Sequence, residues 1–128
     1  MANRHFQNHV QHIVHDPVVV FVEFTVDGSG DPTLVDRGGV SSIAHTATGK
    51  YTVTLQDHYN ALIGADIERP QEDADPQVFG HVISEDVNNT TTPVVVLGYK
   101  VEGGTATDPN ASATLRTRLW LKNSAVGA

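Results

Sequence analysis

The feature that most constrains the fold of this chain is an unbroken run of β-branched and aromatic residues, VVVFVEFTV, at residues 18–26. Successive side chains of a strand point to opposite faces, so every second residue of the run shares a face. One face is wholly apolar and consists of Val18, Val20, Val22, Phe24 and Val26. The other face includes Glu23 and Thr25. The run therefore predicts a strand that is buried on one side and partly covered on the other.

A second local pattern predicts a β-hairpin. Residues 40–46 and 50–55 have the composition of strands, and the short connection ATG at 47–49 joins them. Glycine at the end of this connection can adopt the positive φ that tight hairpin turns require. In the second arm, apolar residues alternate with polar ones, which gives one apolar face and one wet face.

The rest of the chain supplies further strands with turns between them. Weaker strand patterns cover residues 65–69 and 78–84, and stronger patterns cover 94–101 and 113–123. A single helical turn is predicted for residues 57–64, with Asp57 as N-cap and Gly64 as terminator. About seven strands with turn signals between them predict an all-β fold. We expect an antiparallel β-sandwich over residues 17–128, with a jelly roll as the favoured form.

Composition and motifs exclude several classes of function. The chain has 128 residues, no cysteine and a net charge of −7, which predicts one domain without disulfides and no nucleic-acid partner. The longest apolar run is too short to cross a membrane, and the polar N-terminus is unlike a signal peptide, so we expect synthesis in the cytoplasm. Neither GxSxG nor HExxH occurs. The chain is therefore not expected to be an enzyme, and no catalytic residue or cofactor is predicted.

One glycine-rich segment, DGSGD at residues 27–31, carries two carboxylates that could suggest calcium. The segment lacks the third acidic position and the distal glutamate of an EF-hand loop. Glycine, serine and aspartate are also the common residues of turns. A solvated turn is therefore the favoured interpretation, and no metal site is predicted here.

The first sixteen residues differ from the rest, because four of the seven histidines lie in the stretch RHFQNHVQHIVHDP. Neutral imidazoles at helical spacing can share a metal ion, but no Asp or Glu precedes Asp16 to orient the rings. Scattered apolar residues ahead of the first strand are typical of a docking arm that becomes ordered against a partner. We predict such an arm at residues 1–16, and a metal clasp between subunits stays an alternative. The residues expected to bind the partner are His5, Phe6, His9, Val10, His12, Ile13 and His15.

The last predicted strand places its single tryptophan on a basic face. Its leucines alternate with Arg116, Arg118 and Trp120, so these three residues share the face opposite to the leucines. Tryptophan and arginine are enriched in the hot spots of protein interfaces. We therefore predict an oligomer interface at these three residues. Burial of Trp120 in a second sheet, or its use as a ligand platform, stays open.

Three stretches of the chain, GGVSSIAHTATGKYTVTL, TATDPNAS and LRTRLWLKNS, together resemble small structural proteins of tailed bacteriophages. In that family a loop leads into a GV.S strand, G.Y.VTL follows, and a DP loop precedes a strand that closes in NS. The matching positions are Gly39-Val40-Ser41, Gly49, Tyr51, Val53-Thr54-Leu55, Asp108-Pro109 and Asn123-Ser124. The resemblance covers residues 34–124, and no catalytic residue carries over with it.

The resemblance implies a structural protein of the virion that is made in the host cytoplasm and lies on the capsid surface. Its implied role is capsid decoration (cement) by binding the lattice of the major capsid protein. It also implies a symmetric homo-oligomer, with a trimer favoured. The alternative is a head-fibre, tail-fibre or spike domain that contacts carbohydrate on the host surface. The absence of cysteine agrees with assembly in a reducing cytosol.

Overall fold

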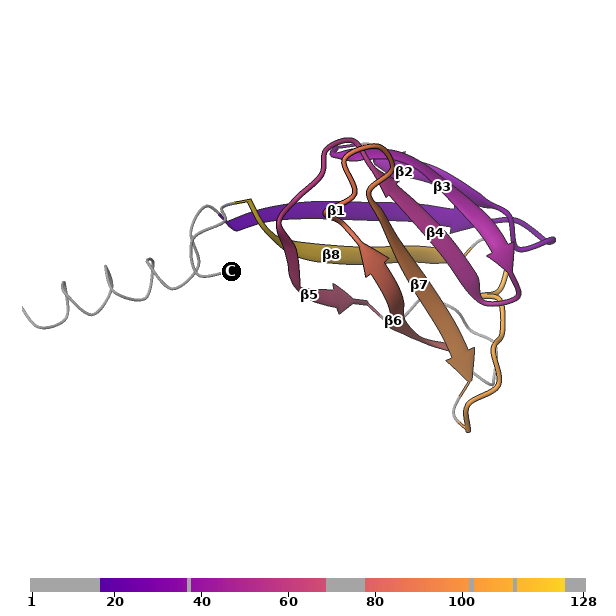
Figure 1. The fold of residues 1–128 in the computed structure, drawn as a ribbon. Coiled ribbons are helices and arrows are strands. Elements are labelled where there is room, and N and C mark those ends of the chain that lie inside the picture. The colour runs from indigo at the N-terminus through magenta and orange to yellow at the C-terminus, as the bar shows by residue number, and fades with distance from the viewer. Residues whose placement is uncertain (1–16, 37, 69–77, 102, 112, 124–128) are drawn as a thin grey trace, which may run out of the picture.

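The computed structural model describes residues 17–36, 38–68, 78–101, 103–111 and 113–123, which form eight β-strands. The strands are β1 (Pro17–Val26), β2 (Pro32–Asp36), β3 (Val40–Ala47), β4 (Lys50–Leu55), β5 (Ala61–Ile67), β6 (Val78–Asp86), β7 (Val94–Val101) and β8 (Thr114–Lys122). They form two four-stranded antiparallel sheets that pack against each other (Figure 1). The predicted all-β antiparallel sandwich is therefore confirmed.

The first sheet, called sheet A, has the strand order β2-β1-β8-β5, and sheet B has the order β3-β4-β7-β6. In Figure 1, β1 and β8 run side by side, and β4 and β7 cross in front of them. The β1–β8 pairing runs from Pro17 opposite Lys122 to Thr25 opposite Thr114, so the first and last strands hold the centre of sheet A. Three of the seven connections, β1–β2, β3–β4 and β6–β7, join neighbouring strands within one sheet, and the other four cross to the opposite sheet.

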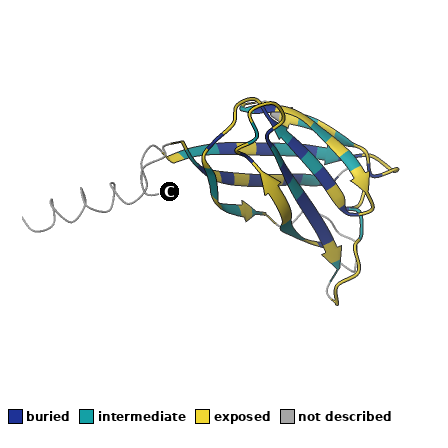
Figure 2. Ribbon diagram, viewed as in Figure 1, coloured by how far each residue is buried: buried dark blue, intermediate teal, exposed yellow. Residues whose placement is uncertain are grey.

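The core lies between the sheets and uses alternate residues of the strands. Figure 2 shows this alternation as dark and light bands along β8. The buried residues of β8 are Leu115, Thr117, Leu119 and Leu121. The residues between them lie on the outer face of sheet A, where they remain available for contacts outside the domain.

Three aromatic side chains fill the centre of the core. The ring centroid of Phe24 lies 5.3 Å from that of Tyr51 and 6.5 Å from that of Tyr99. The two tyrosine rings meet edge to face at 5.7 Å. Burial raises the pKa of both hydroxyls well above the ordinary value for tyrosine, because the ionised form loses its hydration.

The strongest sequence predictions agree with the structure. The apolar face predicted for residues 18–26 points into the core, where Phe24 is fully buried and Val18 is partly buried. The predicted hairpin is β3–β4, and Gly49 in its turn has a φ of 70°. The strands predicted at 94–101 and 113–123 are β7 and β8.

Two parts of the sequence interpretation were wrong. Residues 57–64 form no helical turn: Gly64 lies inside β5, and the backbone N–H of Asn60 donates to the carbonyl of Lys122 at 2.8 Å. Pairing with the neighbouring strand thus replaces the local hydrogen bonds of a helix. The short strand β2 was not predicted, because it has only five residues, begins with proline and lies at a sheet edge.

Candidate functional site

The outer face of sheet A carries side chains that are arranged in rows across three strands. Residues that pair in an antiparallel sheet point to the same side, so the registers of β1, β8 and β5 define these rows. Read from β1 through β8 to β5, the rows are Val19–Trp120–Gly64, Phe21–Arg118–Asp66 and Glu23–Arg116–Glu68, and together they are called the sheet A face. Its two aromatic side chains are exposed, Phe21 by 54% and Trp120 by 38%.

One row of the sheet A face is an ion-paired triad. Arg116 donates from Nε to Glu23 Oε1 at 2.9 Å, and its Nη1 lies 3.5 Å from Glu68 Oε1. The guanidinium thus lies between carboxylates from both neighbouring strands. Because the side chains of Arg116 and Glu68 are about half exposed, water and salt screen the attraction. The triad therefore orders the surface more than it stabilises the fold.

The indole of Trp120 is held at the other end of the face. Its Nε1–H donates to Asp66 Oδ2 at 3.3 Å, which links β8 to β5 on the outer surface. Gly64 lies opposite Trp120 on β5, and a methyl group placed on Gly64 would meet no atom within 4 Å. The strip of surface beside the indole is therefore open.

A groove of about 410 Å³ runs over the middle of this face. It is lined by Phe21, Val22, Glu23, Asp66, Ile67, Glu68, Arg116, Thr117 and Arg118. Five of these nine residues are charged, three with carboxylates and two with guanidinium groups. Arg118 is exposed at the groove, and among the described residues no ion pair or side-chain hydrogen bond engages it.

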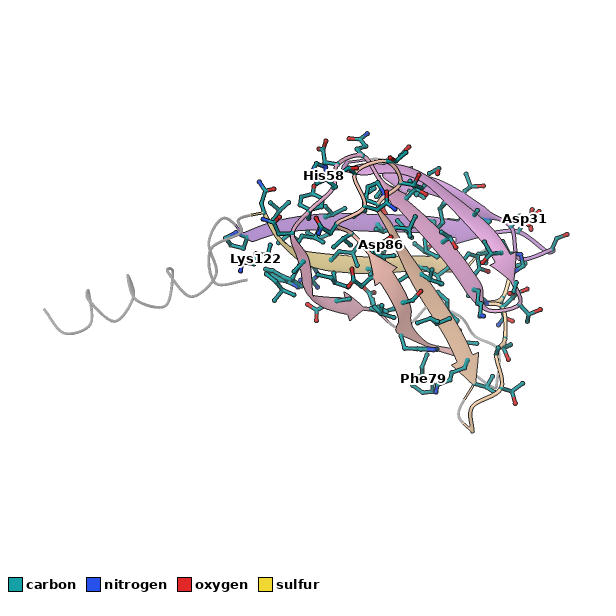
Figure 3. The ribbon with its side chains drawn as sticks, in the orientation of Figure 1. Asp31, His58, Phe79, Asp86 and Lys122 are labelled. Carbon is teal, nitrogen blue, oxygen red and sulfur yellow. The ribbon has the colours of Figure 1, made fainter. Side chains whose placement is uncertain are left out.

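A second polar cluster joins loops at one end of the sandwich. His45 on β3 donates from Nε2 to Asp108 Oδ1 at 2.8 Å, and its Nδ1 lies 3.6 Å from Asp31 Oδ1. The same Asp108 oxygen accepts the backbone N–H of Gly49 at 2.6 Å. We call Asp31, His45, Gly49 and Asp108 the loop-end cluster. Figure 3 shows Asp31 and Lys122 at opposite ends of the sandwich, so this cluster lies away from the Trp120 end of the sheet A face.

Aromatic packing and a glycine close the loop-end cluster against the core. The ring of His45 stacks on Tyr51 with centroids 5.0 Å apart, and the Tyr51 hydroxyl donates to the carbonyl of Gly30 at 2.9 Å. A methyl group on Gly30 would lie 2.5 Å from Asp108 Oδ2. The polar atoms of this cluster therefore satisfy one another, and little room is left for a ligand.

The glycine-rich segment beside this cluster forms the solvated turn favoured by the sequence. Asp27 Oδ1 accepts the backbone N–H groups of Ser29 at 2.8 Å and Asp31 at 2.9 Å. These hydrogen bonds, that from Asp31 first, lower the pKa of the Asp27 carboxyl. No three His, Asp or Glu side chains gather closely enough to hold a metal ion within the described part of the chain.

The structure brings the predicted residues Arg116, Arg118 and Trp120 together on one exposed face, as the alternation of β8 required. Whether copies of the chain meet there stays a prediction. Sequence reasoning missed that Phe21, Asp66 and Glu68 complete this face, because only the strand register and the contacts of Arg116 show it. The loop-end cluster around His45 was not predicted either. The predicted arm residues His5, Phe6, His9, Val10, His12, Ile13 and His15 lie outside the described residues.

Comparisons of the chain with family models, with curated proteins and with solved structures give no match. Over the residues that the structure describes, no helix is long and apolar enough to cross a membrane. The site must therefore be interpreted from its own chemistry.

Proposed function

We propose that this chain is a structural virion protein of a tailed bacteriophage that decorates the capsid as an oligomer. In this proposal, residues 1–16 bind the lattice of the major capsid protein. The eight-stranded sandwich is the body that projects from the capsid surface. The proposal rests on the resemblance of three sequence stretches to small virion proteins, together with the way these stretches meet in the fold.

The observation that carries the proposal is a contact between two of the resembling motifs. Gly49 belongs to the G.Y.VTL stretch and Asp108 to the DP loop, and they lie 59 residues apart in the chain. The backbone N–H of Gly49 nevertheless donates to Asp108 Oδ1 at 2.6 Å. Two of the motifs that carry the resemblance are thus in direct contact, which supports a shared fold over a chance likeness of turn sequences.

The organisation of the sandwich also suits a particle component. A virion protein must stay folded outside the cell, where neither chaperones nor resynthesis can replace it, so slow unfolding is valuable. The pairing of the first with the last strand places both ends of the described chain in the middle of sheet A. Opening this sandwich from either end therefore requires separating β1 from β8 along their whole length. Bound neighbours on a lattice would stabilise the folded state further by mass action.

The test is attachment to the particle. We expect deletion of residues 1–16 to leave a folded β-protein by circular dichroism that no longer binds capsids in a cosedimentation assay. A matched variant that changes only the four arm histidines to glutamine keeps the apolar contacts and separates docking from metal binding. Attachment should survive EDTA at constant pH. Unchanged capsid binding by the deletion variant would contradict the proposal.

The position on the particle is tested by copy number. A decoration protein should occur in a number fixed by the capsid lattice, whereas a fibre or spike protein should follow the number of tails or vertices. Quantitative mass spectrometry of purified particles, with the major capsid protein as internal standard, distinguishes the two. A copy number that matches the number of tails or vertices would place the protein in a fibre or spike instead of the capsid shell.

A further inference from the structure

We propose that the sheet A face binds a neutral oligosaccharide chain, which occupies the groove at Phe21, extends over Trp120 beside the groove and is hydrogen-bonded by Arg118, Asp66 and Glu68. This inference does not rest on the decoration role, because it concerns the outer face of the sandwich alone. It gives the chain a ligand-binding activity in addition to its structural part.

The aromatic side chains provide the stacking surface. Trp120 and Phe21 lie diagonally across the β1–β8 pair, since Trp120 pairs with Val19 and Phe21 pairs with Arg118. Diagonal neighbours in an antiparallel pair are about 7–8 Å apart, still within reach of aromatic side chains. A pyranose ring has an apolar face of C–H groups that packs on an aromatic ring. Two such platforms at this spacing suit successive sugar units of one chain.

The polar groups provide the hydrogen bonds that hydroxyl groups need. Carboxylates are acceptors and guanidinium groups are donors, and hydrogen bonds to charged groups are stronger than those between neutral groups. Arg118 has donors without a partner among the described residues, and Glu68 makes only a 3.5 Å contact to Arg116. Asp66 orients the indole through one oxygen, which fixes the stacking surface before a ligand arrives.

The charge content of the groove decides between kinds of ligand. The cores of protein interfaces are depleted of charged residues, but five of the nine residues that line this groove are charged. Three carboxylates against two guanidinium groups disfavour a polyanion such as nucleic acid or an acidic polysaccharide. The volume of about 410 Å³ falls in the range of roughly 300–1,000 Å³ that is usual for small-ligand sites. A neutral, hydroxyl-rich chain satisfies all three conditions.

The chain carries its own reporter, because Trp120 is its single tryptophan. The probes are maltopentaose, cellopentaose, chitopentaose and α-mannopentaose, with pentagalacturonic acid as the acidic comparison. We expect at least one neutral probe to change Trp120 fluorescence saturably, with a Kd on the order of 1 mM for such an open groove. The acidic probe should bind more weakly. No saturable change with any neutral probe, or preference for the acidic one, would overturn the inference.

Three variants keep the reporter and test the geometry. Phe21→Ser removes one platform, and Arg118→Gln removes the groove's guanidinium that has no partner among the described residues. Each should raise the Kd about tenfold. Gly64→Thr fills the open strip beside the indole and should block stacking. The matched control is Phe79→Ser, which removes an aromatic residue of sheet B that is 41% exposed and should leave the Kd unchanged. Equal effects of Phe21→Ser and Phe79→Ser would refute a specific site.

A second copy of the chain is the competing occupant of this face. Sedimentation equilibrium of the full chain and of Trp120→Ala tests whether a second copy binds there. Circular dichroism spectra of both proteins check that they are folded. We expect the same average mass for both, in contrast to the oligomer interface that the sequence predicts at Trp120. If Trp120→Ala instead converts an oligomer to monomers, the face is a subunit contact and the saccharide inference fails.

Discussion

The sheet A face and the loop-end cluster contain similar side chains in opposite situations. Both combine carboxylates, a cationic or imidazole side chain and aromatic rings. In the loop-end cluster His45 is only 16% exposed, and its Nε2–H and the backbone N–H of Gly49 both donate to Asp108 Oδ1. On the sheet A face Arg116 is 46% exposed, and Arg118 has no partner among the described residues.

The difference shows what each set of polar groups can do. A buried polar group costs free energy unless it is paired, so the N–H of Gly49 and the ring of His45 require Asp108 as their acceptor, which ties the 103–111 loop to the β3–β4 hairpin. An exposed polar group keeps its hydrogen bonds to water and can exchange them for those of a ligand. The loop-end cluster should therefore determine stability, and the sheet A face should determine binding. The predictions that follow test this division.

The largest expected effect comes from a pair of glycines, one in each region. Gly49 has a φ of 70°, and a methyl group there would lie 2.5 Å from the carbonyl oxygen of Tyr99. Gly49→Ala should therefore lower the free energy of unfolding by about 3 kcal/mol. A methyl group on Gly64 would meet open space, and Gly64 lies in a strand. Gly64→Ala should therefore change the free energy of unfolding by less than about 1 kcal/mol. Urea denaturation of both variants measures this, and equal losses would remove the distinction between the regions.

The second prediction concerns Asp108, which serves the loop-end cluster as acceptor. Asp108→Ala leaves the buried N–H of Gly49 and the Nε2–H of His45 without a partner, so we expect a loss of about 2 kcal/mol in the free energy of unfolding. Asp108→Asn keeps one acceptor oxygen and should lose less. Glu68→Ala, at a carboxylate that is 50% exposed, is the matched change on the sheet A face and should cost under about 1 kcal/mol. If Glu68→Ala proves as costly as Asp108→Ala, exposure does not separate the two clusters.

The sequence predicted the sandwich because its strongest signals are local. The alternation around Phe24 and the leucines of β8 fixed which side of each strand is buried, and Gly49 fixed the hairpin turn. The strand β2 and the true start of β5 were not predictable in this way. They depend on pairing with β1 and β8, which supplies hydrogen bonds that no local pattern reveals.

The candidate site was predicted only in the part that lies on one strand. Arg116, Arg118 and Trp120 share a face by simple alternation, so the sequence identified them. Phe21 and Asp66 belong to the same row as Arg118, but they come from strands far away in the chain. Their contribution depends on the register between strands. Register is a property of the whole sheet, and a single sequence does not specify it by itself.

The third prediction is a smaller effect on the sheet A face. Arg116→Gln removes the cation of the ion-paired triad, and we expect a loss of about 0.5 kcal/mol at low salt. Because the side chains of Arg116 and Glu68 are about half exposed, salt screens the attraction, so the loss should vanish near 1 M salt. Chemical denaturation in urea at low and high sodium chloride measures it. A loss that persists at high salt would mean that the triad is structural, like the loop-end cluster.

The smallest expected effect concerns Asp27, whose carboxylate accepts two backbone N–H groups beside the loop-end cluster. These bonds lower its pKa below 3.8, so the folded state favours the ionised form. The stabilisation is therefore present at neutral pH and is lost as the pH falls through the folded-state pKa. Asp27→Ala should be slightly less stable than the parent chain at neutral pH, and the two should converge in acid.

Urea denaturation of the parent chain and of Asp27→Ala across the acidic range tests this, with Asp27→Asn as the control. Asparagine keeps an acceptor oxygen for the turn but cannot ionise, so its difference from the parent chain isolates the charge of the carboxylate. Asp27 is exposed, although it lies next to the loop-end cluster. We therefore expect Asp27→Ala to lower the stability as little as substitutions on the sheet A face do. If Asp27→Ala instead lowered the free energy of unfolding as much as Asp108→Ala does, position in the fold, and not burial, would decide how much a polar group contributes to stability.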